Sequence, residues 1–177
     1  MVSSKRDNFV ITVAQIDCPF IIDVEASGFG PYSYPIEVGL ALDGGQRYST
    51  LIKPPPQWTH WDESAENTHH ISRDVLNTHG KAPIAVAREI NARIEGKTVY
   101  SDGWVVDKPW LVTLFHAAQT PMAFFVSPLE LILNDAQMSC WHATKDRILG
   151  EDRSLRHRAS YDAWIIQRTY QDTRENS

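Results

Sequence analysis

The chain has 177 residues, of which 42% are hydrophobic and 22% are charged, and its formal net charge is −5 at pH 7. This length suits one domain over residues 1–177, with a core over about residues 18–170 and peripheral ends. The negative charge argues weakly against a general nucleic-acid binder, which usually carries a basic excess, but it does not exclude an enzyme that acts on phosphates and concentrates acids at a metal site. No apolar stretch approaches the length of a membrane span.

The two cysteines indicate a reducing environment. Cys18 and Cys140 make no disulfide framework and show no metal-ligand spacing, so we expect free thiols that pack in the interior. The first seven residues lack the apolar segment of a signal peptide. These features together predict a cytoplasmic protein without a membrane partner.

The first part of the chain reads as strands. Residues 8–14 alternate apolar and polar side chains, which suits a short leading strand or arm, and residues 20–24 have the apolar, β-branched character of a buried strand. Residues 35–42 and 47–52 read as two more strands. The Asp-Gly-Gly turn between them predicts an antiparallel hairpin.

Strands then alternate with helices. Prolines 54–56 begin a long loop that leads to a polar helix start near residues 62–66. Pro83 opens a helix with apolar residues at helical spacing, a short strand follows at 98–100, and residues 108–118 form the next helix.

The last third continues the alternation. Residues 123–126 predict another buried strand, Pro128 begins a further helix, and a polar stretch over 142–156 leads to a last helix over 158–170. Residues 171–177 read as a frayed polar tail. The order of elements predicts an α/β fold, with a mixed sheet flanked by helices.

Two carboxylates lie at the end of the strand at residues 20–24. Asp23 and Glu25 are two residues apart, so they point to the same side of the sheet. Two like charges on one face cost free energy unless something neutralises them, and Mg²⁺ prefers carboxylate oxygens. The alternative is a strand end that carries two solvated acids.

Two later segments carry further acids and a histidine. Within residues 99–111 a short strand runs through a turn to Asp107, at the start of a helix. His157 directly precedes the last helix, and Asp162 follows it by five positions.

These segments resemble the DEDDh, or DnaQ-like, family of 3′–5′ exonucleases. Residues 23–29 match the family's first motif, Asp-x-Glu-Thr-Thr-Gly-Leu, and residues 157–163 match its third, His-Arg-Ala-x-x-Asp-Ala. Residues 35–39 match its second strand, and residues 69–72 resemble its His-Gly-Ile-Thr turn. The resemblance covers residues 20–170 and implies an RNase H-like fold, whose five-stranded mixed sheet combines an antiparallel hairpin with parallel strands.

The second motif of the family leaves a choice. Asp107 fits its metal-binding acid, and Asp102, in the position of an asparagine, is the alternative. Ser101 replaces the histidine that usually precedes this asparagine, and Ala26 and Ser27 replace the threonine pair that holds the terminal nucleotide. The catalytic set is complete, while the preference for DNA or RNA stays open.

The resemblance implies a metal-dependent exonuclease that releases nucleoside 5′-monophosphates from single-stranded DNA or RNA. The expected ligands of two Mg²⁺ ions, which Mn²⁺ can replace, are Asp23, Glu25, Asp107 and Asp162. His157 is the expected general base. It can meet Asp162 only from the loop before the helix, because five residues at about 100° each separate the two side chains around a helix.

Residues beside the motifs are the candidates for substrate contacts: Ala26, Ser27, Gly28, Phe29, His70, Trp104 and Arg158. Phe29 takes the place of a leucine that wedges against the last base, with a core residue as the alternative. His70 is a pocket residue or a hydrogen-bonded loop histidine, and no second ligand pair supports a zinc site at the His-His pair. Trp104 is a candidate for stacking on a base.

Three arginines surround His157. Arg153, Arg156 and Arg158 suit contacts to the phosphate backbone, with a solvated charged face as the alternative. Trp110 and Trp164 are expected in the core.

Two alternative functions use the same fold. One is a catalytically silent nucleic-acid-binding or scaffold domain, which the complete set of acids and histidine disfavours. The other is a proofreading or processing subunit of a larger complex. Several relatives are dimers, so a homodimer is an expectation by analogy only.

Overall fold

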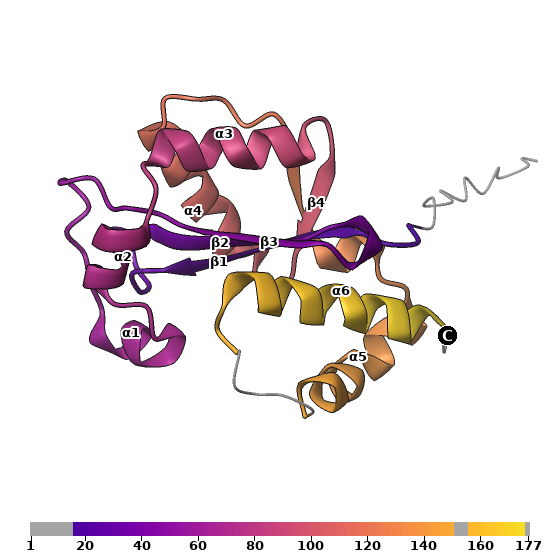
Figure 1. Ribbon diagram of the computed structural model, residues 1–177. Coiled ribbons are helices and arrows are strands. Elements are labelled where there is room, and N and C mark those ends of the chain that lie inside the picture. Colours follow the sequence, from indigo (N-terminus) through magenta and orange to yellow (C-terminus); the bar gives the residue numbers. More distant parts are fainter. Residues whose placement is uncertain (1–15, 151–155, 176–177) are drawn as a thin grey trace, which may run out of the picture.

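A five-stranded mixed sheet forms the centre of the computed structural model, which describes residues 16–150 and 156–175 (Figure 1). The strand order is β3-β2-β1-β4-β5. The strands are β1 (Phe20–Ala26), β2 (Pro35–Ala41), β3 (Arg47–Leu51), β4 (Thr98–Ser101) and β5 (Phe125–Pro128). The first three pair antiparallel, and β4 and β5 join β1 in parallel. The predicted fold class and the predicted hairpin are both confirmed.

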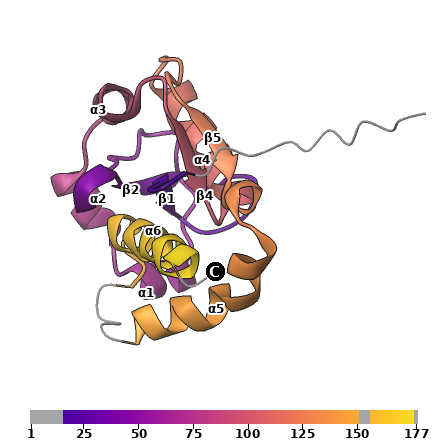
Figure 2. The same cartoon turned by 90° about the vertical axis from the view of Figure 1, so that its right-hand side faces the viewer.

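Helices cover both faces of this sheet (Figure 2). They are α1 (Glu63–His69), α2 (Arg73–His79), α3 (Pro83–Ile94), α4 (Trp104–Ala117), α5 (Asp135–Leu149) and α6 (Ala159–Glu175), with short 3₁₀ helices at Asp43–Gly45 and Leu129–Ile132. α3 and α4 lie on one face, while α5 and α6 lie on the other (Figure 1). Within the described ranges, no helix combines the length and the apolar character needed to cross a bilayer.

Alternation along β1 decides which way its acids point. Ile22 and Val24 are buried in the core beneath α3 and α4. Ile21 belongs to the opposite core, which α5 and α6 complete. Asp23 and Glu25 continue the alternation of Ile21, so both carboxylates face the layer that contains α6.

A glycine lets α6 approach the sheet. Gly39 on β2 pairs with Asp23, and a β-carbon there would lie 2.1 Å from the backbone carbonyl carbon of Ala159. No side chain fits in that space. The first turn of α6 therefore rests directly on β2, beside the strand that carries the acids.

The edge strand differs from the sequence prediction. β5 begins at Phe125 rather than at residue 123, and Phe125 is 70% exposed. The residue that fills the core here is Phe124, just before the strand. The prediction of a buried strand was wrong because β5 pairs on one side only, at the edge of the sheet.

Helix boundaries differ as well. α4 begins at Trp104, four residues before the predicted start, and α6 runs on to Glu175, with Asp172 and Thr173 buried. The prediction of a frayed tail was therefore wrong over residues 171–175. α5 extends through residue 149, across much of the stretch expected to be a polar connection, and a capping box of Asn134 and Gln137 begins it.

Two further expectations concern residues at the margins. Cys18 and Cys140 are free thiols, as predicted, but both are half-buried rather than buried. The suggested leading strand at residues 8–14 and Arg153 lie outside the described residues.

Candidate active site and metal centre

The four predicted metal ligands meet in one cavity of about 380 Å³. Asp23 and Glu25 enter it from β1, Asp107 from the first turn of α4, and Asp162 from the first turn of α6. The parallel pairing of β1 with β4 brings the start of α4 beside the carboxyl end of β1. Three segments far apart in the sequence thus contribute acids to one site.

Asp107 and Asp102 occupy different surroundings. Asp107 is buried, lines the main cavity, and accepts a hydrogen bond from the Ser101 hydroxyl at 2.5 Å. Asp102 forms an ion pair with Lys145 at 2.7 Å and lines a smaller neighbouring cavity of about 110 Å³. Of the two candidates, Asp107 shares the main cavity with Glu25.

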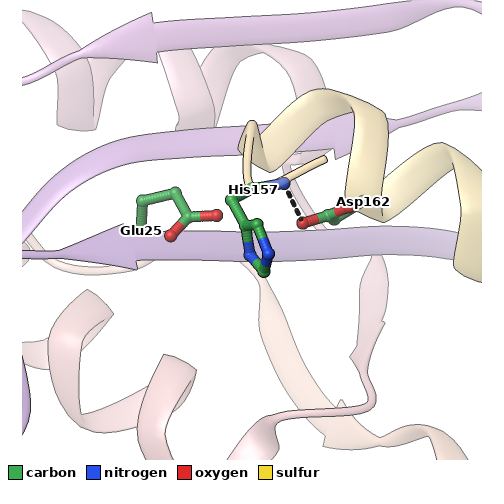
Figure 3. A group of neighbouring side chains, drawn as sticks. All are labelled: Glu25, His157 and Asp162. Carbon is green, nitrogen blue, oxygen red and sulfur yellow. Dashed lines mark hydrogen bonds between the residues drawn. The ribbon is translucent and has the colours of Figure 1, made fainter. Parts of the chain in front are cut away.

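His157 sits on the loop before α6, where the sequence predicts it. Its backbone is left-handed, with φ of 64°, and its backbone N–H donates a hydrogen bond to Asp162 Oδ2 at 3.0 Å (Figure 3). Ligand atoms of His157, Glu25 and Asp162 lie within 4.8 Å of one another. The bend at His157 returns the imidazole toward the acids of the sheet, where it lies between Glu25 and Asp162 in this view.

A buried ion pair anchors the segment that contains His157. Glu37 pairs with Glu25 across β1 and β2 and is fully buried. Its carboxylate accepts hydrogen bonds from Arg158 Nε at 3.1 Å, from Arg158 Nη2 at 2.8 Å and from the Ala159 N–H at 3.0 Å. The Arg158 guanidinium is therefore tied to the sheet, whereas the sequence suggested a contact with substrate.

Sequence reasoning assigned no role to Glu37. The sequence signal was a single charged residue in the otherwise uncharged run at 35–41, all of which the structure buries. Such a residue requires a partner. The partner is 121 positions away, and nothing local identifies it.

Burial and mutual repulsion disfavour the charged forms of these acids. Burial, followed by the charge of Asp107, raises the pKa of Asp23 well above its ordinary value. Burial, followed by the charge of Asp162, raises the pKa of Glu25 to about 8. Burial also raises the pKa of Asp107 to about 7 and raises that of Asp162.

The donor set fits divalent cations. In the described part of the chain, none of these four carboxylates forms an ion pair with a lysine or arginine. Hard cations that prefer carboxylate oxygens would supply the missing positive charge. The residues best placed to hold such ions are Asp23, Glu25, Asp107 and Asp162.

The rim of the cavity is apolar and partly aromatic. Phe29 is 74% exposed and lies 5.9 Å, between ring centroids, from Trp110, which also lines the cavity. The alternative of Phe29 as a core residue is wrong. Ala26 and Gly28 line the same cavity, while Ser27 is buried behind it and hydrogen-bonds His60 Nδ1 at 3.0 Å.

The structure brings His69 rather than His70 to the cavity. His70 is an exposed left-handed residue that ends α1, with φ of 56°. His69 is buried and lines the cavity; its Nδ1 accepts the Ile71 N–H at 3.1 Å, while its Nε2 has no hydrogen-bond partner among the described residues. Burial lowers the pKa of His69. The sequence did not separate the two, because where α1 ends decides which histidine faces inward.

Trp104 is turned away from the main cavity. Its indole N–H donates a hydrogen bond to the Val126 carbonyl at 3.2 Å, and Lys108 lies over its ring. Trp110 is buried as expected, although one side of it borders the cavity, and Trp164 is half-buried beside Tyr161.

Comparison with known proteins identifies the fold. No protein-family model matches the sequence, and no curated protein sequence matches it. Solved structures do: zinc-bound exonuclease I of E. coli in complex with single-stranded DNA superimposes with a TM-score of 0.71 at 13% identity, over 92% of this chain and 41% of that one.

Two further structures agree. Exonuclease I of E. coli with a dA16 oligonucleotide gives a TM-score of 0.67 at 12% identity, over 88% of this chain and 40% of that one. Exonuclease I from Methylocaldum szegediense gives 0.55 at 11% identity, over 74% and 30%. This chain spans about two fifths of the length of the E. coli chains. It has the fold of the matching part of exonuclease I, which agrees with the exonuclease fold that the motifs predicted.

Proposed function

We propose that this chain is a metal-dependent 3′–5′ exonuclease that releases nucleoside 5′-monophosphates from single-stranded DNA or RNA ends. One observation carries the proposal. Asp23, Glu25, Asp107, Asp162 and His157 come from three separate segments and converge on one cavity. The cavity lies within the range of volumes that bind small ligands, so it suits a single terminal nucleotide.

The acids would act by holding metal. When bound there, two Mg²⁺ or Mn²⁺ ions would offset the negative charge that develops on the attacked phosphodiester. The carboxylates of β1 are fixed by the sheet, and those of α4 and α6 by the first turns of these helices. The chain thus supplies a rigid set of oxygen ligands before substrate arrives.

His157 would act as the general base. An imidazole can accept the proton of an attacking water near neutral pH. The backbone bond from His157 to Asp162 and the anchoring of Arg158 by Glu37 hold the loop that presents it. A base on a loop needs this support, because its position would otherwise vary.

The apolar rim would receive the terminal nucleotide. Phe29 and Trp110 offer aromatic surface to a base, and Ala26 and Gly28 leave room for the sugar beside Glu25. His69 lines the same cavity and would border the bound nucleotide beside Ala26.

The test is digestion of 5′-labelled single-stranded DNA and RNA oligomers with Mg²⁺, with Mn²⁺ or with EDTA. We expect a ladder that shortens from the 3′ end, requires metal, and is lost in Asp162→Asn and His157→Ala. Asp74→Asn, which changes an exposed acid on α2, is the matched control and should behave as the parent. Activity that survives EDTA, or cleavage that begins within the oligomer, would refute the proposal.

A further inference from the structure

A second hollow lies beside the candidate active site. It has a volume of about 440 Å³ and is lined by residues of two loops, 31–34 and 57–60, and by Thr113 of α4. Its aromatic members are Tyr32, which is 81% exposed, Tyr34 and Trp58. We call it the aromatic groove.

The aromatic groove shares a wall with the active-site cavity. Trp110 lines the cavity, and its indole N–H donates a hydrogen bond at 2.8 Å to the hydroxyl of Ser33, which lines the groove. On the other side, His60 lines the groove and hydrogen-bonds Ser27, directly after the strand that carries the acids. The groove therefore adjoins the cavity on the side of Trp110.

The surface of the groove suits stacking rather than charge. Half-buried Trp58 is stacked on the buried ring of Tyr34, with ring centroids 5.0 Å apart, which holds the Trp58 ring in place as one aromatic wall. Tyr32 presents an exposed ring. Lysine and arginine do not occur among the described residues that line the groove. A strand bound here would be held through its bases and not through its phosphates.

We propose that the aromatic groove binds the nucleotides that precede the terminal one in a single-stranded substrate, by stacking of their bases on Tyr32 and on Trp58. This inference rests on the proposed function, because it takes the cavity as the place of the terminal nucleotide. A duplex does not fit, since its bases are already stacked on one another. Every base has an aromatic face, so the groove should accept many sequences.

The proposal predicts that affinity grows with substrate length. The p-nitrophenyl ester of thymidine 5′-monophosphate occupies only the active-site cavity, whereas an oligothymidylate of eight nucleotides also reaches the groove. Tyr32→Ala should raise KM for the octamer about tenfold, which corresponds to the loss of one stacked base. It should leave kcat and the hydrolysis of the ester unchanged. Tyr32→Phe keeps the ring and should restore the parental KM.

Phe125, on the edge strand β5, provides a matched control. Phe125 is also strongly exposed, at 70%, and it lines neither the cavity nor the aromatic groove. Phe125→Ala should therefore match the parent on both substrates. A KM for the octamer that is unchanged in Tyr32→Ala would overturn the proposal, as would an equal loss on the ester.

Binding separates this proposal from the proposed function. Fluorescence anisotropy of a labelled octamer in EDTA measures affinity without hydrolysis. Tyr32→Ala should weaken binding about tenfold relative to the parent and to Phe125→Ala, whether or not nucleotides are later released. Equal affinity in all three proteins, or no binding to the parent, would refute the aromatic groove as a strand site. Binding without metal-dependent release would instead refute the exonuclease.

Discussion

Replacement of Glu37 by alanine tests how α6 and His157 are held on the sheet. The Glu37 side chain is 1% exposed and accepts four hydrogen bonds from described residues: two from Arg158, one from the Ala159 N–H and one from the Ser49 hydroxyl. Removal of the carboxylate leaves the Ala159 N–H buried without an acceptor, which costs about 1.5–3 kcal/mol. The Arg158 side chain is 46% exposed and can regain water, so its share is about 1 kcal/mol or less.

The free energy of unfolding should therefore fall by about 1.5–4 kcal/mol in Glu37→Ala. Urea denaturation measures it directly. The matched control is Glu89→Ala, because Glu89 also pairs with a cation, Lys81 at 2.7 Å, but its side chain is 32% exposed. We expect a loss of about 1 kcal/mol there.

The activity of Glu37→Ala should also show whether Glu37 holds the loop that presents His157. With Arg158 released from Glu37, the loop that presents His157 gains freedom, so kcat should fall while KM for an oligomer changes little. Glu37→Gln keeps one acceptor oxygen and should retain more of both stability and kcat. The reasoning would be refuted by a Glu37→Ala variant no less stable than Glu89→Ala, or by one with parental kcat.

Two other predictions concern packing and pH. In Gly39→Ala the new β-carbon meets backbone of Ala159, which cannot yield as a side chain would, so we expect a loss of about 1–3 kcal/mol together with most of the activity. Gly150→Ala, whose β-carbon would meet its nearest atom at 3.4 Å, is the control and should unfold with the parent's midpoint. Burial raises the pKa of Glu25 to about 8 and that of Asp107 to about 7, so the metal-free fold keeps protons that the unfolded chain loses above about pH 4.5. The protons retained by these two acids stabilise the fold fully below pH 4, and this stabilisation is lost as pH rises through 7 to 8. Without metal, the midpoint of thermal unfolding should therefore be lower at pH 8.5 than at pH 6. Mg²⁺ or Mn²⁺ should raise the midpoint more at pH 8.5; an equal metal effect at both values would count against the acids as ligands.

Local patterns predicted the strands of the site well. The alternation at Asp23 and Glu25 placed both acids on one face because the side-chain period of a strand is fixed by the backbone. The turn between residues 43 and 45 fixed the hairpin for a similar local reason. The edge position of β5 depends on how many strands join the sheet, which no local pattern contains.

Polar helices were harder to recognise. Residues 142–149 lack an apolar stripe, yet they continue α5, which begins at its capping box and buries Trp141 against α6. The same holds for residues 171–175, whose buried polar side chains are satisfied within α6 and by its neighbours. Both segments are helical because of tertiary packing, which the spacing of apolar residues does not reveal.

Some residues of the candidate site were predictable from local sequence, and others depend on tertiary contacts. The motifs predicted its acids and the loop position of His157, because these follow from local order. The choice between His69 and His70, and the pairing of Arg158 with Glu37, depend on how distant segments meet. Sequence reasoning placed Arg158 at the substrate since it could not see the buried carboxylate.

Metal binding at the four acids is the central claim, and calorimetry tests it most directly. We would titrate Mn²⁺ into the parent, Asp23→Asn and Asp74→Asn in the presence of a nucleoside 5′-monophosphate, with a titration into the nucleotide alone subtracted. We predict two ions per chain for the parent and for Asp74→Asn, and the loss of at least one in Asp23→Asn. A parent that takes up no Mn²⁺, or isotherms that coincide for the parent and Asp23→Asn, would contradict the account.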